Sequence, residues 1–120
     1  MTTSTTFDIR RFSRAFEARD AFSQVERYAP NATVTIADPT AQPSSPRVIH
    51  GRDAIAEWVQ DTCSREMTHV VTQAVQDDHG AAYAVTCSYP DGAKVLCATV
   101  LKLDQGLITE QTLVQVWDES

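Results

Sequence analysis

Residues 81–103, AAYAVTCSYPDGAKVLCATVLKL, decide the fold because they read as two long strands joined by a tight turn. Apolar residues recur with a period of two on both sides of Pro90-Asp91-Gly92, which is typical of strands with one buried face. Proline first and glycine third suit a type I turn followed by a left-handed residue, the common three-residue hairpin. The stretch therefore predicts an antiparallel hairpin.

The same pattern extends the hairpin into a four-stranded meander. Strands are predicted over residues 67–77, 81–89, 93–103 and 107–117, and each connecting triplet ends in glycine. If all three turns are three-residue hairpins, the residues that flank each turn pair and set the register. The rows then predicted to face the core are Val75-Tyr83-Thr99-Gln111, Gln73-Val85-Cys97-Leu113, Val71-Cys87-Val95-Gln115 and His69-Tyr89-Ala93-Trp117.

Two helices are predicted at the start of the chain. Thr6 is positioned to cap the first, in which Ile9, Phe12 and Phe16 make one apolar stripe. Asp20 is positioned to cap a short second helix over residues 21–28. Its inward residues are predicted to be Phe22 and Val25, and Pro30 is predicted to end the pattern.

A third helix is predicted after Gly51, followed by the meander. Its apolar stripe has the spacing i, i+3, i+4, i+7, i+8 and comprises Ile55, Trp58, Val59, Thr62 and Cys63. Helices, one early strand and a run of later strands together indicate an α+β fold. Residues 1–120 are expected to form a single domain.

Asp38 is the most informative polar residue in the early strand. It follows Val34 and Ile36 in a period-two run, so its carboxylate is in phase with the apolar face. A charge aimed at a core costs several kcal/mol unless it is paired, protonated or facing a cavity. Asp38 therefore suggests a pocket with acid/base chemistry; the alternative is a strand-end aspartate that turns to solvent or caps the loop over residues 39–46. That loop either covers the pocket mouth or is a plain surface connection.

Composition narrows the classes of partner. Ten Lys and Arg against sixteen Asp and Glu give a formal charge of −6, which argues against nucleic acid. No apolar run approaches the roughly 18 residues of a membrane span, and the first residues lack a signal pattern, so a cytoplasmic protein is expected. No histidine pair or His/Asp/Glu cluster has metal-ligand spacing, and no nucleotide motif occurs, so no metal or cofactor is expected.

The cysteines are expected to be reduced, buried and inert. Cys63, Cys87 and Cys97 are odd in number and lack C-x-x-C spacing. The predicted register makes Cys87 and Cys97 diagonal neighbours roughly 7 Å apart, too far for an unstrained disulfide.

Four short motifs carry a family resemblance over nearly the whole chain. They are Ala15-Phe16-Glu17-Ala18-Arg19-Asp20, Tyr28-Ala29-Pro30-Asn31-Ala32-Thr33-Val34, Gly51-Arg52-Asp53-Ala54-Ile55 and Trp117-Asp118. In this order they resemble the nuclear transport factor 2-like superfamily, particularly its SnoaL-like bacterial members. The resemblance implies a curved mixed or antiparallel sheet wrapped around the N-terminal helices into a cone, an α+β barrel with an internal apolar pocket. That superfamily includes ketosteroid isomerases, polyketide cyclases, dehydratases, epoxide hydrolases and members that only bind or dimerise.

Comparison with the ketosteroid isomerases implies roles for individual residues. Asp38-Pro39 looks like their proton-shuttling aspartate, whereas Phe12 and Thr99 stand where their strong oxyanion donors are expected. Ordinary steroid isomerisation is therefore not expected. Tyr83 either replaces those donors or simply lines the pocket, and His69 is a second candidate acid or base. His50 is either a rim residue or a surface histidine.

Two functional hypotheses follow. The first is a cofactor-independent isomerase, cyclase or dehydratase that acts on a small hydrophobic carbonyl compound, with Asp38, Tyr83 and His69 as catalytic residues. The expected ligand-binding residues are Phe12, Phe16, Trp58, Val85, Cys97, Thr99, Gln111, Leu113 and Gln115. The second is a non-catalytic binding or dimerisation module, because Leu96, Val100, Val114 and Val116 give the outer sheet face an apolar patch suited to a homodimer.

Overall fold

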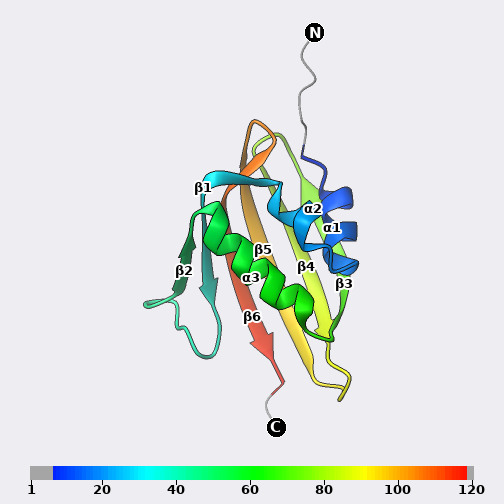
Figure 1. Cartoon of the computed structure of the whole chain (residues 1–120). Helices are drawn as coiled ribbons and strands as arrows, with labels where there is room; N and C mark the ends of the chain where they lie inside the picture. The colour runs from blue at the N-terminus through cyan, green and yellow to red at the C-terminus, as the bar shows by residue number, and fades with distance from the viewer. Residues whose placement is uncertain (1–6, 119–120) are drawn as a thin grey trace.

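In the computed structural model, residues 7–118 are described, and within them six strands form a curved, open sheet with three helices on one face (Figure 1). The strands are β1 (Tyr28–Ala37), β2 (Arg47–His50), β3 (Thr68–Gln76), β4 (Gly80–Ser88), β5 (Lys94–Asp104) and β6 (Leu107–Trp117). The helices are α1 (Ile9–Glu17), α2 (Ala21–Val25) and α3 (Arg52–Ser64). The order is β2-β1-β6-β5-β4-β3, with β1 and β6 parallel and the other pairs antiparallel. The predicted α+β class with a mixed, curved sheet is confirmed.

The central hairpin has the predicted register. Tyr83 stands opposite Thr99, and Val85 stands opposite Cys97. Gly92 has φ +93°, and its N–H donates to the carbonyl of Tyr89 at 3.0 Å. A left-handed residue costs little only when it is glycine, so this turn was readable from local sequence.

The turn between β3 and β4 differs from the prediction. The Asp77 carboxylate accepts hydrogen bonds from the N–H groups of His79 and Gly80, which folds the loop around Asp77 and brings Asp77 opposite Gly80. Gly80 is not left-handed; a Cβ there would lie 2.9 Å from the carbonyl oxygen of Leu101, so close strand approach requires glycine.

A bulge in β3 changes which side chains face inward. It falls between Val71 and Gln73, so the strand's inward phase switches at that point. Val75, predicted to face the core, is 67% exposed, and Ala74 takes its place beside Tyr83.

The turn between β5 and β6 also shifts the pairing. Gln105 and Gly106 both have positive φ, 52° and 80°, which is the two-residue type I′ geometry. With a bulge near Leu103, the register moves by two residues. Thr99 stands opposite Leu113 instead of Gln111, yet an even shift keeps every side chain on its predicted face.

The same two-residue displacement applies to the remaining rows. On β6, Gln115 stands opposite Cys97 and Trp117 stands opposite Val95. On β3, Val71 stands opposite Val85 and His69 stands opposite Cys87 instead of Tyr89. The partners predicted for Gln73, Val71, His69, Leu113 and Gln115 were therefore wrong, because the bulges and turn types that set them are not visible in the strand pattern.

The first helices differ from the prediction at their ends. Asp8 is the N-cap of α1, and its carboxylate accepts from the N–H of Arg10 at 2.9 Å; Thr6 lies outside the described residues. Asp20 caps α2 as predicted. The helix ends at Val25, Phe22 is 77% exposed, and Gln24 takes the buried position.

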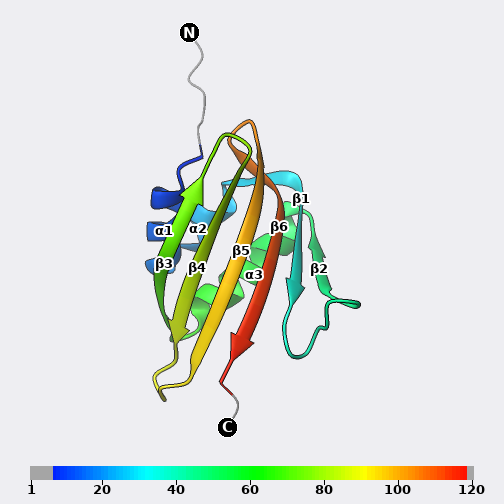
Figure 2. The ribbon, with the colours of Figure 1, turned by 180° about the vertical axis from the view of Figure 1, so that it is seen from behind.

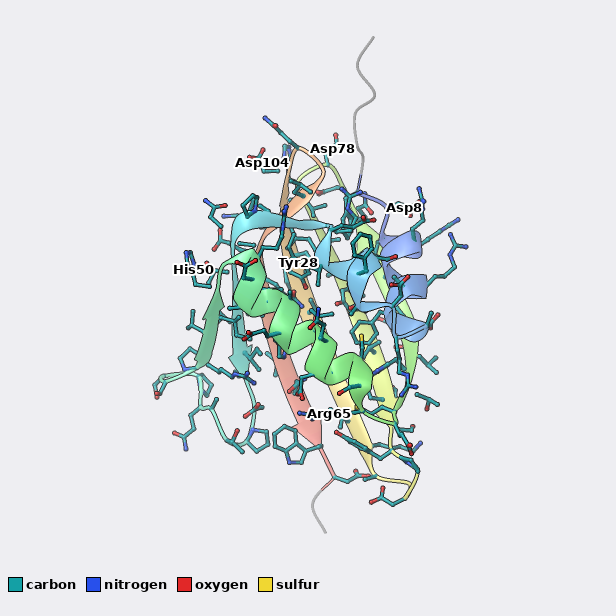
Figure 3. All side chains as sticks on the ribbon, viewed as in Figure 1. Asp8, Tyr28, His50, Arg65, Asp78 and Asp104 are labelled. Carbon is teal, nitrogen blue, oxygen red and sulfur yellow. The ribbon has the colours of Figure 1, made fainter. Side chains whose placement is uncertain are left out.

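Residues 28–50 contain the largest change in secondary structure. Tyr28 and Pro30 belong to β1 and do not end a helix. The short strand β2 was not predicted; it pairs with β1, and Ile49 stands opposite Val34. His50 lies on this outer edge, where its Nδ1 is 2.9 Å from the Thr33 hydroxyl (Figure 3).

The helices leave one face of the sheet uncovered. The Gln76 amide accepts from Ile9 N–H and donates to the Phe7 carbonyl, which fastens the start of α1 to β3. Along α3, the buried residues Ile55 and Val59 face the sheet. Figure 2 shows the opposite face, with every helix behind the sheet. No helix among residues 7–118 is long and apolar enough to cross a membrane.

Candidate functional site

A cavity of about 490 Å³ lies between the concave face of the sheet and the helices. The cavity extends along α3, from Tyr28 near the start of that helix to Arg65, the C-cap residue at its end. We call the Tyr28 end the closed end, because Tyr28 and Gln111 are only 2% and 3% exposed there. Figure 3 shows Tyr28 and Arg65 at these two ends. The charged lining residues are Asp38, Arg47, Asp61, Arg65, Lys94 and Asp118.

The observed strand pairing orders the inner wall into successive rows. The row nearest the closed end contains Gln111, and the next contains Ile36, Leu113, Thr99 and Tyr83. The third contains Gln115, Cys97 and Val85, and the last contains Trp117, Val95, Cys87 and His69. The wall is therefore mainly apolar, with polar side chains in every row.

Two buried tyrosines supply hydrogen-bond donors at the closed end. The Tyr28 hydroxyl donates to Oε1 of Gln111, and Tyr83 stands opposite Thr99 on the neighbouring strand. Burial, with a smaller contribution from Tyr83, raises the pKa of Tyr28 well above its usual value. Burial likewise raises the pKa of Tyr83. Both phenols therefore stay protonated at neutral pH and act as donors.

The Tyr28 contact also orients the Gln111 amide. Because Oε1 accepts from the tyrosine, the NH₂ group of Gln111 is the part left for other partners. The closed end thus offers an N–H donor and phenol groups, the chemistry that binds a carbonyl or hydroxyl oxygen.

Asp38 lies at the end of β1 and lines the cavity. Its Oδ1 accepts from the N–H of Thr40 at 2.8 Å and from the Thr40 hydroxyl at 2.7 Å. The carboxylate therefore caps the following loop and faces the cavity at once, combining the two interpretations that the sequence left open. Ala37 pairs with Val114 on β6, so the next residue, Asp38, lies level with Gln115. Asp38 is therefore in the same row as Gln115 and Cys97.

His69 is buried between α1 and the sheet. Its ring meets Phe16 edge to face, with centroids 4.6 Å apart, and its Nδ1 is 3.0 Å from Sγ of Cys87. Burial, followed by the positive charge of Arg19, lowers the pKa of His69. The imidazole is therefore neutral at pH 7 and one ring nitrogen can accept a proton. Within residues 7–118 no cluster of three His, Cys, Asp or Glu side chains suits a metal ion.

Most of the site residues proposed from sequence meet in this cavity. Those that line it are Asp38, Tyr83, His69, Phe16, Trp58, Val85, Cys97, Thr99, Gln111, Leu113 and Gln115. Phe12 does not; it is 4% exposed and packs behind the wall, its ring centroid 6.4 Å from Tyr28 and 6.2 Å from Tyr83. Phe12 was expected to contact the ligand, but it instead packs against the rings of Tyr28 and Tyr83.

Sequence reasoning missed Tyr28 and the pairing of His69 with Cys87. Tyr28 had been placed at the end of a helix, although Tyr28-Ala29-Pro30 has a proline that disfavours helix at the preceding residue. That signal could have moved the strand start forward. The His69 contact depends on the displaced register of β3 and has no local signal.

Comparison with known proteins identifies the family of this chain. Residues 9–111 match the SnoaL-like domain family. A nuclear transport factor 2-like protein of unknown function from Mesorhizobium loti has a TM-score of 0.78 and 17% identity, covering 89% of this chain and 86% of that one. A candidate ketosteroid isomerase from Kribbella flavida has a TM-score of 0.70 and 19% identity, covering 93% and 76%.

A third structure is SalBIII, an epoxide hydrolase/cyclase-like enzyme of pyran ring formation in the polyether salinomycin. Its TM-score is 0.68 at 21% identity, covering 89% of this chain and 86% of that one. No curated protein matches the chain. These identities establish a shared fold, and the family match spans most of the sequence. The chain therefore belongs to the SnoaL-like domain family and has the fold of nuclear transport factor 2-like proteins.

Proposed function

We propose that this protein binds a small, mainly apolar carbonyl compound in the cavity and moves a proton on it, with Asp38 as the base. The observation that carries the proposal is one cavity with donors at its closed end and a carboxylate in its wall. Such an arrangement suits a cofactor-independent isomerase, cyclase or dehydratase. The names of two structural neighbours, a candidate ketosteroid isomerase and an epoxide hydrolase/cyclase-like enzyme, agree with this reaction class.

The closed end of the cavity is the proposed binding site for the ligand oxygen. Tyr83 and the Gln111 amide donate to that oxygen and stabilise negative charge that develops on it as a proton leaves the adjacent carbon. Tyr28 holds Gln111 in the donating orientation and is thus a positioning residue. His69, neutral and in the last row, is placed to return a proton.

The two oxygens of Asp38 have different roles in this proposal. Oδ1 is held by both hydrogen bonds from Thr40, which fixes the carboxylate at the end of β1. Among the described residues Oδ2 accepts no hydrogen bond, so it is the oxygen left free to take the proton.

The test compares Asp38→Asn with wild type on a panel of cyclic and aromatic ketones. Asparagine keeps an oxygen for Thr40 but cannot take the proton, so turnover should fall by about 10²–10⁴. The matched control is Asp104→Asn, the same charge change at the far end of the sheet (Figure 3). Equal turnover by Asp38→Asn and wild type on a converted compound would eliminate Asp38 as the base.

Binding can be measured without a known reaction. The chain has two tryptophans, and both Trp58 and Trp117 line the cavity. A bound ligand should therefore change the intrinsic fluorescence, and the same panel can be titrated for affinity. A panel with no saturable response would count against the cavity as a carbonyl site.

A second candidate function is a homodimeric module that pairs through the uncovered sheet face. Leu96, Val100, Val114 and Val116 are between 47% and 61% exposed there, and Leu96 stands opposite Val116 on adjacent strands. A continuous apolar patch of this kind favours a second copy of the same surface. Light scattering after size exclusion should give a dimer mass at micromolar concentration, reduced to a monomer by Leu96→Glu. A wild-type monomer would exclude this interface.

A further inference from the structure

Gln24 is a buried polar side chain on the helix side of the cavity. It belongs to the five-residue helix α2, is 4% exposed and lines the cavity, whereas its neighbour Phe22 is turned to solvent. A short helix that buries an amide and exposes an aromatic ring reverses the usual arrangement. Burying an amide costs stability unless its polar atoms have partners, so the partners of Gln24 bear on its role.

The amide nitrogen of Gln24 is bound outside the cavity. Nε2 donates to the carbonyl oxygen of Asp20 at 3.2 Å and to Sγ of the free Cys63 at 3.5 Å. Neither of these two residues lines the cavity. A reversed amide would direct Oε1 at the Asp20 carbonyl oxygen and bring two acceptors together, so these contacts fix the orientation. The NH₂ group therefore points away from the cavity, and Oε1 is the amide atom directed toward it.

Oε1 of Gln24 is left without a partner in the protein. Within residues 7–118 it accepts no hydrogen bond. The enclosed side-chain polar atoms that lack a partner in this part of the chain are Oγ of Ser13 and Nε of Arg27. Oε1 is not one of them, so protein atoms do not seal it off, and the cavity is the space that Gln24 lines. An acceptor with a fixed direction in a buried cavity favours a ligand that brings a donor.

Thr62 gives the helix side of the cavity the same polarity. It lies on α3 and lines the cavity, and its hydroxyl donates to the Trp58 carbonyl at 3.0 Å. Because that bond uses its one proton, the Thr62 oxygen is left as an acceptor for a ligand. The sheet side differs at the closed end, where Gln111 has its NH₂ group available. The two sides therefore suit a ligand with both an acceptor and a donor.

We propose that Gln24 is a specificity-determining residue that accepts a hydrogen bond from a hydroxyl or N–H group of the ligand, so that the cavity prefers carbonyl compounds carrying such a donor. This inference rests on the proposed function, because the carbonyl oxygen is the group assigned to the closed end. It concerns binding and does not require Asp38 to act as the base.

The probes are tetralone, its isomeric ring-hydroxylated derivatives and the methyl ethers of those derivatives. These bicyclic ketones are small enough for a cavity of about 490 Å³. The methyl ether keeps the ring and its oxygen but has no donor. Isothermal titration calorimetry on the wild-type chain should give at least one hydroxytetralone an affinity about tenfold above both its methyl ether and tetralone itself.

Gln24→Met tests the residue directly, because methionine keeps the length of the side chain and removes the acceptor. The affinity for the preferred hydroxytetralone should fall about tenfold, while the affinities for tetralone and the methyl ether stay unchanged. A merely structural role would lower all three affinities together. Gln24→Glu should keep the preference, since a buried protonated carboxyl donates to the Asp20 carbonyl and retains an acceptor oxygen. Gln60→Met, the same substitution on the exposed side of α3, is the matched control.

Wild-type affinities decide the matter even if a variant fails to fold. Equal binding of each hydroxytetralone and its methyl ether would overturn the role of Gln24 and leave the carbonyl site standing. A preference that survives in folded Gln24→Met would assign the hydroxyl to another acceptor, such as Asp38 or Gln115, and would also overturn it. No binding of any tetralone would overturn this inference together with the carbonyl site.

Asp38→Asn separates the two proposals. It should lose turnover and keep the preference for the hydroxytetralone, because Gln24 acts in binding. Unchanged turnover with the preference intact would remove Asp38 as the base and support the role of Gln24. Loss of the preference in folded Asp38→Asn would show that Asp38 binds the hydroxyl, which contradicts the assignment to Gln24.

Discussion

Replacing Tyr28 with phenylalanine tests the polar end of the cavity most directly. The Tyr28 hydroxyl is fully buried and donates to Oε1 of Gln111, which is buried as well. The substitution keeps the ring and its contact with Phe12, so it removes one hydrogen bond and leaves a buried acceptor unpaired. That costs about 1–3 kcal/mol in the free energy of unfolding. For 120 residues the unfolding entropy is about 0.25 kcal/mol/K, so the melting temperature should fall by about 4–12 °C.

Differential scanning calorimetry measures this shift, and Tyr89→Phe is the matched control. Tyr89 also loses a hydroxyl, but it is only partly buried and lines the cavity beside charged side chains. Its variant should stay within about 0.5 kcal/mol of wild type. Tyr28→Phe should also weaken binding of ketones about fivefold, because the freed Gln111 amide can turn its oxygen toward the ligand.

A double-mutant cycle tests whether the loss of stability comes from the unpaired Gln111 acceptor. Gln111→Leu removes the unpaired acceptor, so the double variant should be more stable than the sum of the two single losses implies, by about 0.5–3 kcal/mol. A melting shift for Tyr28→Phe no larger than that for Tyr89→Phe, or strictly additive losses, would refute the reasoning.

Two further predictions concern Gly80 and His69. Gly80→Ala places a Cβ 2.9 Å from the Leu101 carbonyl and should lower the free energy of unfolding in urea by about 1–3 kcal/mol; an unchanged midpoint would contradict the close approach of β4 and β5. Burial, followed by the charge of Arg19, lowers the pKa of His69 in the folded protein. As pH falls, the unfolded chain therefore binds a proton at His69 before the folded chain does. The stabilisation from neutral His69 is complete above about pH 6.5 and declines as pH falls toward the folded-state pKa. His69→Gln should flatten the pH dependence of unfolding as pH falls below about 6.5, and a slope equal to that of wild type would be incompatible with a buried neutral imidazole.

Much of the fold was predictable from the sequence, because period-two alternation depends only on neighbouring residues. Tyr83, Val85, Thr99 and Gln111 face inward as predicted, since each follows from its own strand. The prediction failed at Val75, where a bulge reverses the phase, and at Phe22, where five helical residues are too few to establish a stripe. The strand β2 was not predicted, because it is short and directly follows the proline-rich segment over residues 39–46.

Most members of the candidate site were predictable from the sequence, whereas Phe12, Tyr28 and the arrangement of the site were not. Asp38 was identified by phase alone, and the structure adds its attachment to Thr40. The placements of Tyr28 and Phe12 could not be derived, because which aromatic ring reaches the cavity depends on how α1 and β1 pack together.

By itself the sequence determined the α+β class, the order of its elements apart from β2, and the face on which most site residues lie, because backbone periodicity and turn residues act over a few positions. Only the tertiary structure decided which residues touch. The two-residue shifts on both sides of the central hairpin bring His69 to Cys87 and Gln115 to Cys97, contacts that the predicted register does not contain. Those shifts arise from the Asp77 loop, the Gln105-Gly106 turn and the bulges, whose hydrogen bonds form between strands and leave no pattern within one.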